Sequence, residues 1–300
     1  MNAEETMFSE GRQITGSTRL VGLLGGDVRY SLSLRLHNRA FDALGLNWAY
    51  LPLPVSAAAP ERLGEAIRGL RALNFVGANV TMPFKERVID HLDEITPAAR
   101  RMGAVNTILH RRDGSLIGGN TDAEGFIADL GANGVSLPDR RVIVLAAGGA
   151  ARAVAHGLAE RGCAALYIVN RTAERAERLA AELTDSFPGQ SVQIAPWSSR
   201  ADLSTPGDGA LVVNCTPVGM DGVRTPSGAE SPWPAPIRPD QVVADLVYAP
   251  LHTPLLASAE AAGATAISGL GMLIQQAALS FSWWTNQVPP ISQMQAALEL

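Results

Sequence analysis

The stretch Arg141-Val142-Ile143-Val144-Leu145, followed by Ala146-Ala147-Gly148-Gly149-Ala150-Ala151, decides the fold of this 300-residue chain. An almost uninterrupted apolar run predicts a buried strand, and the small residues after it predict a tight turn that opens a helix. This order is typical of dinucleotide-binding domains, because glycines let a pyrophosphate approach the backbone at the helix N-terminus. The sequence therefore predicts a nucleotide-binding α/β domain around these residues.

The turn departs from the usual G-x-G-x-x-[GA] template at its first position. Ala146, Gly148 and Ala151 align with the template, so alanine replaces the first glycine. An alanine pays an energetic cost to adopt a positive φ, which glycine does not. On the template alone, an ordinary strand-to-helix connection is the alternative reading.

The surrounding pattern alternates short apolar runs with helical periodicity, which favours parallel sheets covered by helices. In the first third we predict strands and helices at Leu20–Leu24, Ser33–Leu44, Trp48–Val55, Glu61–Leu73 and Phe75–Val80. After the glycine-rich turn we predict elements at 150–161, Leu166–Val169, Thr172–Leu183, Leu211–Asn214 and Val242–Leu246. A last helix is predicted at Gly271–Trp284. The middle third therefore has the pattern of a doubly wound nucleotide-binding fold.

The residues after the second strand of this domain indicate which dinucleotide is bound. NAD-selective sites usually place a carboxylate there, but this chain has Asn170-Arg171-Thr172. A guanidinium suits a 2′-phosphate, which it can bind through two hydrogen bonds. Arg175 lies one turn further along, where the alternative is a solvated helix face paired with neighbouring glutamates. The prediction is a preference for NADP.

Composition and charge bound the remaining function classes. Hydrophobic residues make up 47% of the chain and charged residues 18%, so the chain can bury a large hydrophobic core. The net charge of -5 argues against a nucleic-acid binder. Two cysteines, Cys163 and Cys215, form no disulfide framework and favour a reduced, cytoplasmic setting. Cys215 reads as a small buried residue rather than a nucleophile.

Neither a signal peptide nor a membrane helix is predicted. Residues 1–19 contain acidic residues and no apolar core of a signal sequence. The uncharged stretch from Ala261 to Leu298 is interrupted by glycines, glutamines and an asparagine, so we expect a buried helix there. No His/Cys cluster has metal-ligand spacing, so no metal is predicted.

Four polar segments follow apolar runs in the first third of the chain. Ligands of open α/β sheets bind at such strand ends, and hydroxyl and amide groups suit a polyhydroxylated small molecule. Local turn chemistry is the alternative for each segment, and Ser33 in particular is a candidate helix cap. The segments are Ser31-Leu32-Ser33, Asn79-Val80-Thr81-Met82-Pro83-Phe84-Lys85, Gly103-Ala104-Val105-Asn106-Thr107 and Gly119-Asn120-Thr121-Asp122.

With these motifs the chain resembles the shikimate dehydrogenase family, including its quinate/shikimate members, over nearly its whole length. Further resembling motifs are Asn170-Arg171-Thr172, Asn214-Cys215-Thr216-Pro217-x-Gly219-Met220, Asp245-Leu246-Val247-Tyr248 and Gly269-Leu270-Gly271-Met272-Leu273-x-x-Gln276. The family also usually has proline at the positions of Asp27 and Leu34 and histidine at that of Tyr30. Since proline presets turn geometry, this loop is expected to be shaped differently here.

The resemblance implies a role for each matching residue. Lys85 and Asp122 match the catalytic pair beside the reacting hydroxyl. The implied substrate contacts are Ser31, Ser33, Thr81, Asn106, Tyr248 and Gln276. The implied cofactor residues are Ala146, Gly148, Gly149, Ala150, Asn170, Arg171, Thr172, Arg175 and Thr216, with Gly269 and Met272 near the nicotinamide.

The resemblance also implies an architecture and an activity. Residues 1–122 with 270–300 are expected to form a parallel-sheet substrate domain, and residues 123–269 a Rossmann-type NADP domain, with a cleft between them. The expected reaction is the reversible reduction of 3-dehydroshikimate to shikimate, a step of aromatic amino acid biosynthesis. The alternatives are a quinate/shikimate or aminoshikimate-type dehydrogenase using NAD(P), or a non-catalytic metabolite-binding member. We expect a small-molecule substrate, no nucleic-acid or membrane partner, and a homodimer as the candidate assembly.

Overall fold

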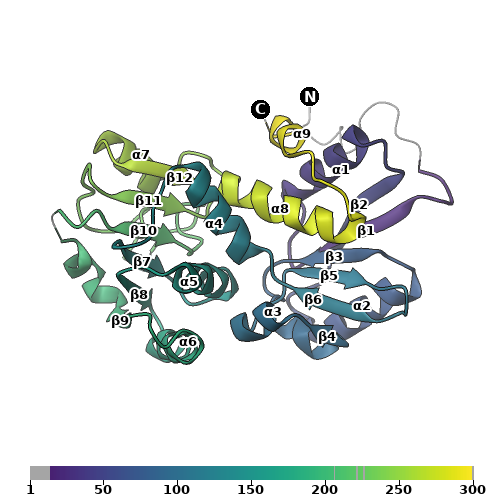
Figure 1. Ribbon diagram of the computed structural model, residues 1–300, viewed down its shortest axis with the longest axis horizontal. Coiled ribbons are helices and arrows are strands. Elements are labelled where there is room, and N and C mark those ends of the chain that lie inside the picture. Colours follow the sequence, from purple (N-terminus) through teal and green to yellow (C-terminus); the bar gives the residue numbers. More distant parts are fainter. Residues whose placement is uncertain (1–13, 206, 221, 226, 299–300) are drawn as a thin grey trace. The chain divides into compact units, whose positions relative to one another are not determined.

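The computed structural model describes residues 14–205, 207–220, 222–225 and 227–298. Most of the segment for which no signal peptide is predicted therefore lies outside the described residues. The chain divides into two compact units, each described below by itself (Figure 1). Unit 1 comprises Met1–Thr121 and Ile274–Leu300, and unit 2 comprises Asp122–Leu273.

The sheet of unit 1 has six strands in the order β2-β1-β3-β5-β6-β4. Their bounds are β1 Arg19–Gly25, β2 Trp48–Pro54, β3 Gly77–Val80, β4 Glu94–Ile95, β5 Thr107–His110 and β6 Leu116–Gly119. β5 runs antiparallel to β3 and to β6, whereas the other pairs are parallel. The sheet is therefore mixed rather than wholly parallel, because a tight turn at Asp113-Gly114 joins β5 to β6 as a hairpin.

The helices of unit 1 bury apolar stripes against this sheet. Leu36, Ala40 and Phe41 of α1 are fully buried, as the spacing of apolar residues predicts. The helices are α1 Ser33–Ala43, α2 Leu63–Ala72, α3 Pro97–Met102 and α9 Ile291–Ala296, with 3-10 turns η1 Pro60–Arg62 and η2 Arg87–His91. Most of α8, Gly269–Thr285, also belongs to this unit. There Trp284 Nε1 donates to the Ile108 carbonyl of β5 at 2.9 Å.

The sheet of unit 2 is wholly parallel, in the order β12-β11-β10-β7-β8-β9. This is the strand order of a doubly wound dinucleotide-binding fold: β8 and β9 extend the sheet on one side of β7, and β10 to β12 extend it on the other. The strands are β7 Arg141–Leu145, β8 Ala165–Asn170, β9 Val192–Pro196, β10 Leu211–Asn214, β11 Val242–Asp245 and β12 Thr265–Ser268.

Side chains alternate between two cores, one on each face of this sheet. Val142 and Val144 of β7 belong to one core, and Ile143 and Leu145 to the other. Both faces are covered, which explains why β7 reads as a continuous apolar run. The helices are α4 Asp122–Ala132, α5 Gly149–Arg161, α6 Ala173–Ser186 and α7 Pro254–Ala261, with the 3-10 turn η3 Trp197–Leu203 and the start of α8. No helix in the described part of the chain has the length and apolar character needed to cross a bilayer.

Candidate active site

The polar segments of unit 1 meet at one edge of its sheet. Leu24 of β1 is paired with Val80 of β3, so the loops after these two strands lie side by side. Thr107 at the start of antiparallel β5 is paired with Asn79 on one side and with Gly119 at the end of β6 on the other. The predicted residues adjoining these strand ends are Ser31, Ser33, Thr81, Lys85 and Asn106.

Asn106 lies in a buried network of amides and hydroxyls. Its Oδ1 accepts the Thr121 backbone N–H at 2.8 Å and the Thr107 hydroxyl at 2.9 Å. Its Nδ2 lies 2.9 Å from Thr121 Oγ1 and 3.5 Å from Gln276 Oε1. Unit 1 therefore brings together two predicted substrate residues, Asn106 and Gln276, although they are far apart in the sequence.

Ser280 completes this network and was not predicted. Its hydroxyl lies 2.8 Å from Thr107 Oγ1 and 3.1 Å from Thr121 Oγ1, and it donates to the Gln276 carbonyl at 3.0 Å. Asn79 donates to the Ser280 hydroxyl at 3.1 Å. The available signal was the spacing, since residues four apart share one face of a helix and Ser280 follows Gln276 by four.

The two serines and Thr81 are held by backbone contacts. Ser33 is the first residue of α1 and 7% exposed, while Leu32 occupies the N-cap position without a side-chain cap. The capping alternative for Ser33 is therefore wrong, which leaves its hydroxyl uncommitted to the helix end. Ser31 Oγ accepts the Ser33 N–H at 3.3 Å. The Thr81 N–H donates to the Leu24 carbonyl at 2.8 Å.

An ion pair shapes the loop before these serines. Arg29 donates to both oxygens of Asp27, at 3.0 and 2.8 Å. The guanidinium also lies 5.4 Å from the centre of the Tyr30 ring, which is 81% exposed. Asp27 and Tyr30, which stand where the family usually has proline and histidine, are therefore both held by contacts with the Arg29 side chain.

Lys85 lies in a loop of unit 1, and Asp122 lies at the start of a helix of unit 2. The Lys85 carbonyl accepts the Val105 N–H at 2.8 Å, which ties its loop to the segment before Asn106. Asp122 is the first residue of α4 and 4% exposed, and a carboxylate at a helix N-terminus is electrostatically favourable. Tyr248 follows β11 in unit 2, where burial raises the pKa of its phenol.

The glycine-rich turn of unit 2 has the predicted strand-turn-helix form. Ala146 has φ +115° and donates its N–H to the Val169 carbonyl at 2.8 Å, so alanine holds a conformation that favours glycine. A Cβ at Gly148 would meet no atom within 4 Å, which means that open space faces the backbone there. Gly149 and Ala150 begin α5. Such an exposed backbone at a helix N-terminus suits a pyrophosphate.

A cavity of about 610 Å³ lies beyond the ends of β8 and β9. Asn170, Arg171, Ala173 and Ala176 line one part, and Ile194 to Ser198 line another, including Trp197. Arg171, which the sequence predicts to bind a phosphate, lines this cavity, whereas Thr172 and Arg175 do not. Glu177 also lines it and was not predicted. An aromatic ring, an amide and a guanidinium fit the adenosine end of a dinucleotide, so the residues present are compatible with NADP.

A second buried network arranges the loops after β10 and β11. Asn214 Nδ2 donates to Asp245 Oδ1 at 2.8 Å, and its Oδ1 accepts the Thr216 hydroxyl at 2.7 Å. Asp245 also accepts the Thr253 hydroxyl at 2.7 Å and the Val247 N–H at 3.0 Å. This buried carboxylate, whose pKa is raised by burial, thus links the loop of Thr216 to that of Tyr248.

The cysteines have no features of a nucleophile. Burial raises the pKa of Cys163 to about 11, and burial together with the Asp245 charge raises that of Cys215 further. Among the described residues, no three His, Cys, Asp or Glu side chains cluster as a metal site.

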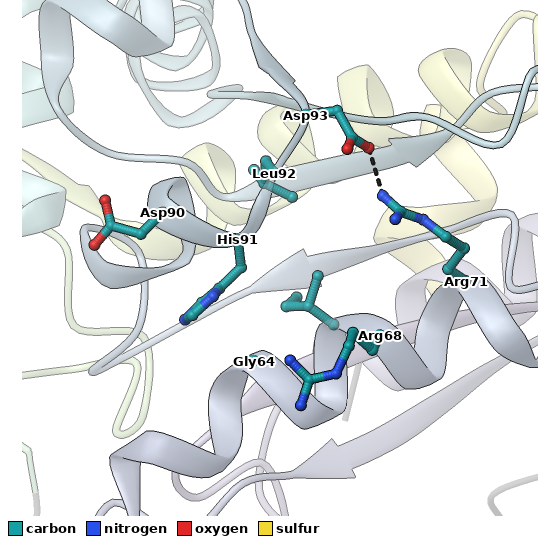
Figure 2. Close-up of a pocket in the computed structure, with 8 residues that line it drawn as sticks. Gly64, Arg68, Arg71, Asp90, His91, Leu92 and Asp93 are labelled. Carbon is teal, nitrogen blue, oxygen red and sulfur yellow. Dashed lines mark hydrogen bonds and ion pairs between the residues drawn. The ribbon is translucent and has the colours of Figure 1, made fainter.

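A smaller cavity of about 280 Å³ in unit 1 contains none of the predicted residues (Figure 2). Arg68 and Arg71 of α2 line it opposite Asp90 and His91 of η2, and Arg71 pairs with Asp93 at 2.5 Å. It is not part of the candidate active site.

A parallel sheet in dinucleotide-binding order, joined in one chain to a mixed sheet whose strand ends carry buried amide and hydroxyl side chains, is typical of a class of α/β oxidoreductases. Comparison with known proteins gives the family. The chain matches the model of the shikimate dehydrogenase substrate binding domain at residues 23–108, that of shikimate / quinate 5-dehydrogenase at 129–194, and that of the shikimate 5'-dehydrogenase C-terminal domain at 269–299.

Individual relatives agree with these models along the whole chain. A shikimate dehydrogenase (NADP(+)) of Salinibacter ruber is 46% identical over 293 residues, covering 95% of this chain and 98% of the relative. Shikimate 5-dehydrogenase from Listeria monocytogenes, solved with shikimate and NAD, is 34% identical with a TM-score of 0.85, covering 95% of this chain and 98% of that one. Quinate dehydrogenase from Corynebacterium glutamicum, solved with NAD, is 29% identical with a TM-score of 0.83, covering 93% and 98%. The chain belongs to the shikimate dehydrogenase family.

Proposed function

We propose that this chain catalyses the reversible, NADP-linked reduction of 3-dehydroshikimate to shikimate, with Lys85 and Asp122 as the catalytic pair. The observation that carries the proposal is that Lys85 is the only lysine of the chain, every other strongly basic residue being arginine. An arginine keeps its proton at any working pH, whereas an ammonium can release one. The one lysine thus adjoins the strand ends that carry the proposed substrate residues.

In this proposal each residue has a separate task. Lys85 donates a proton to the substrate oxygen during reduction and removes it during oxidation, a contribution worth about 10²–10⁴-fold. Asp122 orients the reacting hydroxyl and the ammonium. Asn106 and Gln276 bind further hydroxyls, and Ser31, Ser33, Thr81 and Tyr248 complete the substrate contacts. A bound nicotinamide would supply the hydride donor or acceptor.

The cofactor is assigned to the strand ends of unit 2. The glycine-rich turn from Ala146 to Ala150 would hold the pyrophosphate, and Arg171 the 2′-phosphate. Asn170, Thr172, Arg175 and Thr216 are proposed to assist, and Gly269 with Met272 to lie beside the nicotinamide. Unpaired thiols support a cytoplasmic location, and a homodimer remains a prediction that sedimentation can test.

The unique lysine makes the central test direct. We expect Lys85→Ala to lower kcat by about 10²–10⁴-fold and Lys85→Arg, which keeps the charge but not the proton transfer, to lower it comparably. Arg87→Ala, an exposed neighbour on η2, is the matched control. If Lys85→Arg retains full turnover, proton transfer by this residue is refuted.

Quinate is the second candidate substrate. Asp27, which pairs with Arg29, stands where the family usually has proline in the substrate loop, and one relative with a similar fold is a quinate dehydrogenase. A kcat/KM panel with shikimate, quinate and an aminated analogue, each with NADP and NAD, separates the candidates. Binding without turnover on every alcohol tested would instead support a non-catalytic member.

A further inference from the structure

We propose that Asp129, a buried carboxylate of α4, is a positioning residue that holds the first turn of α8 and thereby sets cofactor binding. This inference rests on the proposed function for its kinetic consequence, because Gly269 and Met272 of that turn are the residues proposed to lie beside the nicotinamide. Nothing in the sequence patterns singles out Asp129. The geometry around it within unit 2 carries the argument.

The Asp129 carboxylate is aimed at the start of α8. It accepts the backbone N–H of Met272, the fourth residue of α8. It lies so close to the Gly271 Cα that a Cβ there would overlap its Oδ1 and Cγ. Asn133, one turn along α4, donates to Asp129 Oδ1 at 3.2 Å and fixes the carboxylate from the other side.

The same turn is confined on its other side by Leu246, the residue that follows β11. A Cβ at Gly269 would overlap the backbone of Leu246, so only glycine permits this approach. The two glycines of this turn are therefore required for different reasons: Gly269 by the close approach of the Leu246 backbone, and Gly271 by the close approach of the Asp129 carboxylate. Met272 is 8% exposed and packs in the core of unit 2. A displacement of this turn would therefore disturb the packing of its neighbours.

Asp129 is also titratable in the working range of an enzyme. It is 6% exposed, and burial raises the pKa of its carboxyl to about 6, against the opposing hydrogen bonds from Met272 and Asn133. No other charged side chain contributes to this shift, and the described residues of α8 include none. Below about pH 6 the acid is protonated, and its bond to the Met272 N–H loses the strength of a charge-assisted hydrogen bond.

The central experiment compares wild type with Asp129→Asn, which keeps an acceptor of the same shape but cannot ionise. We expect the Kd for NADP⁺ to be about five-fold higher in the variant at pH 8, the difference between a charged and a neutral hydrogen bond. The ratio of the two Kd values should fall towards one at pH 5, where wild type is also neutral. Taking the ratio cancels the titration of the cofactor's own 2′-phosphate, which has a pKa of about 6. Asp185→Asn, the same change at an exposed position of α6, is the matched control.

A measurement without cofactor or substrate tests the local part of the inference. Amide hydrogen exchange of the peptide containing Gly269 to Leu273 should be faster in Asp129→Asn than in wild type at pH 8, with Asp185→Asn unchanged. Asn133→Ala is the second variant, because loss of its hydrogen bond raises the pKa of Asp129 further. The pH midpoint of the Kd profile should then be higher in Asn133→Ala than in wild type.

The outcomes separate this inference from the proposed function. A Kd ratio that is one at pH 8, or that does not change with pH, overturns the role of Asp129. If Asp129→Asn fails to fold, an unmoved midpoint in Asn133→Ala has the same meaning. Absence of wild-type turnover with shikimate would refute the proposed function while leaving the exchange and Kd comparisons decisive for Asp129.

Discussion

Arg171 is the residue on which we expect cofactor choice to depend most directly. Arg171 lines the cavity beyond β8. We expect Arg171→Asp to raise the KM for NADP⁺ by about 10- to 100-fold, because charge-assisted hydrogen bonds to the 2′-phosphate are replaced by repulsion. The KM for NAD⁺ should change far less. Steady-state kinetics with both cofactors measure this, and unchanged selectivity contradicts it.

Glu177 provides the complementary comparison in the same cavity. Its carboxylate repels a phosphate but can accept a ribose hydroxyl. Glu177→Gln should therefore favour NADP⁺ over NAD⁺ further. A shift in the opposite direction would show that the carboxylate does not face the 2′ position.

Ala146 is strained because its φ of +115° lies where a Cβ is disfavoured. Ala146→Gly should raise the free energy of unfolding by about 1 kcal/mol, the relief of strain exceeding the added chain entropy of glycine. Ala147→Gly, next to it but without positive φ, should lower stability instead. Denaturant unfolding measures both, and a destabilised Ala146→Gly would show that the turn is not strained.

At the scale of elements, the central strands of unit 2 were predicted well and the antiparallel hairpin of unit 1 was not. β7 and β10 have the bounds that their apolar runs predict, Arg141–Leu145 and Leu211–Asn214. Such strands are buried on both faces, so their composition alone identifies them. β5 and β6 are four residues each; Asn106 directly precedes β5, and Thr121 lies just beyond β6. Their pairing depends on a turn at Asp113-Gly114, a local hairpin signal that the alternating β and α pattern obscured.

Helix α8 combines two tasks in one element. Its start belongs to unit 2 and its remainder, from Ile274, to unit 1. In unit 1 it contributes Gln276 and Ser280 to the network of Asn106. The sequence predicts the helix from its uncharged length, but not that Ser280 would meet three hydroxyl and amide partners.

Ser280→Ala tests this network. Removal of the hydroxyl leaves Asn79 and two threonines short of a partner, so we expect a loss of about 1–3 kcal/mol in stability. The KM for shikimate should rise several-fold while kcat changes less, because Asn106 and Gln276 lose their common support. Ser282→Ala is the control, since the Ser282 hydroxyl only returns to the Ala278 carbonyl of its own helix. An unchanged KM would mean that the position of the Asn106 side chain does not depend on the Ser280 hydroxyl.

At the scale of the whole molecule, the two units differ in how the chain builds them. Unit 2 is one continuous stretch, Asp122–Leu273, with a core on each face of its sheet. Unit 1 needs the C-terminal segment, because Trp284 bonds to β5 and Ser280 to the residues around Asn106. The two units should therefore respond differently to truncation.

We expect a fragment of residues 122–273 to fold cooperatively by itself, and a chain ending at residue 273 to keep only unit 2 folded. Amide exchange of peptides from β3 and from β7 measures this in the truncated chain. Protection lost at β3 but retained at β7 is the expected result. Protection of both strands would mean that unit 1 does not depend on its C-terminal segment.

The sequence by itself determined the fold class, the family, the cofactor turn and most strand ends, because these follow from local runs of apolar residues and from short motifs. It also named Lys85 and Asn106, since their types and neighbours are distinctive. Only the tertiary structure brought Ser280, Glu177 and Asp129 to the places where they contact the Asn106 network, the cavity beyond β8 and the start of α8. Their partners come from elements distant in the chain, and burial changes the chemistry of a hydroxyl or carboxyl in ways that no local pattern records.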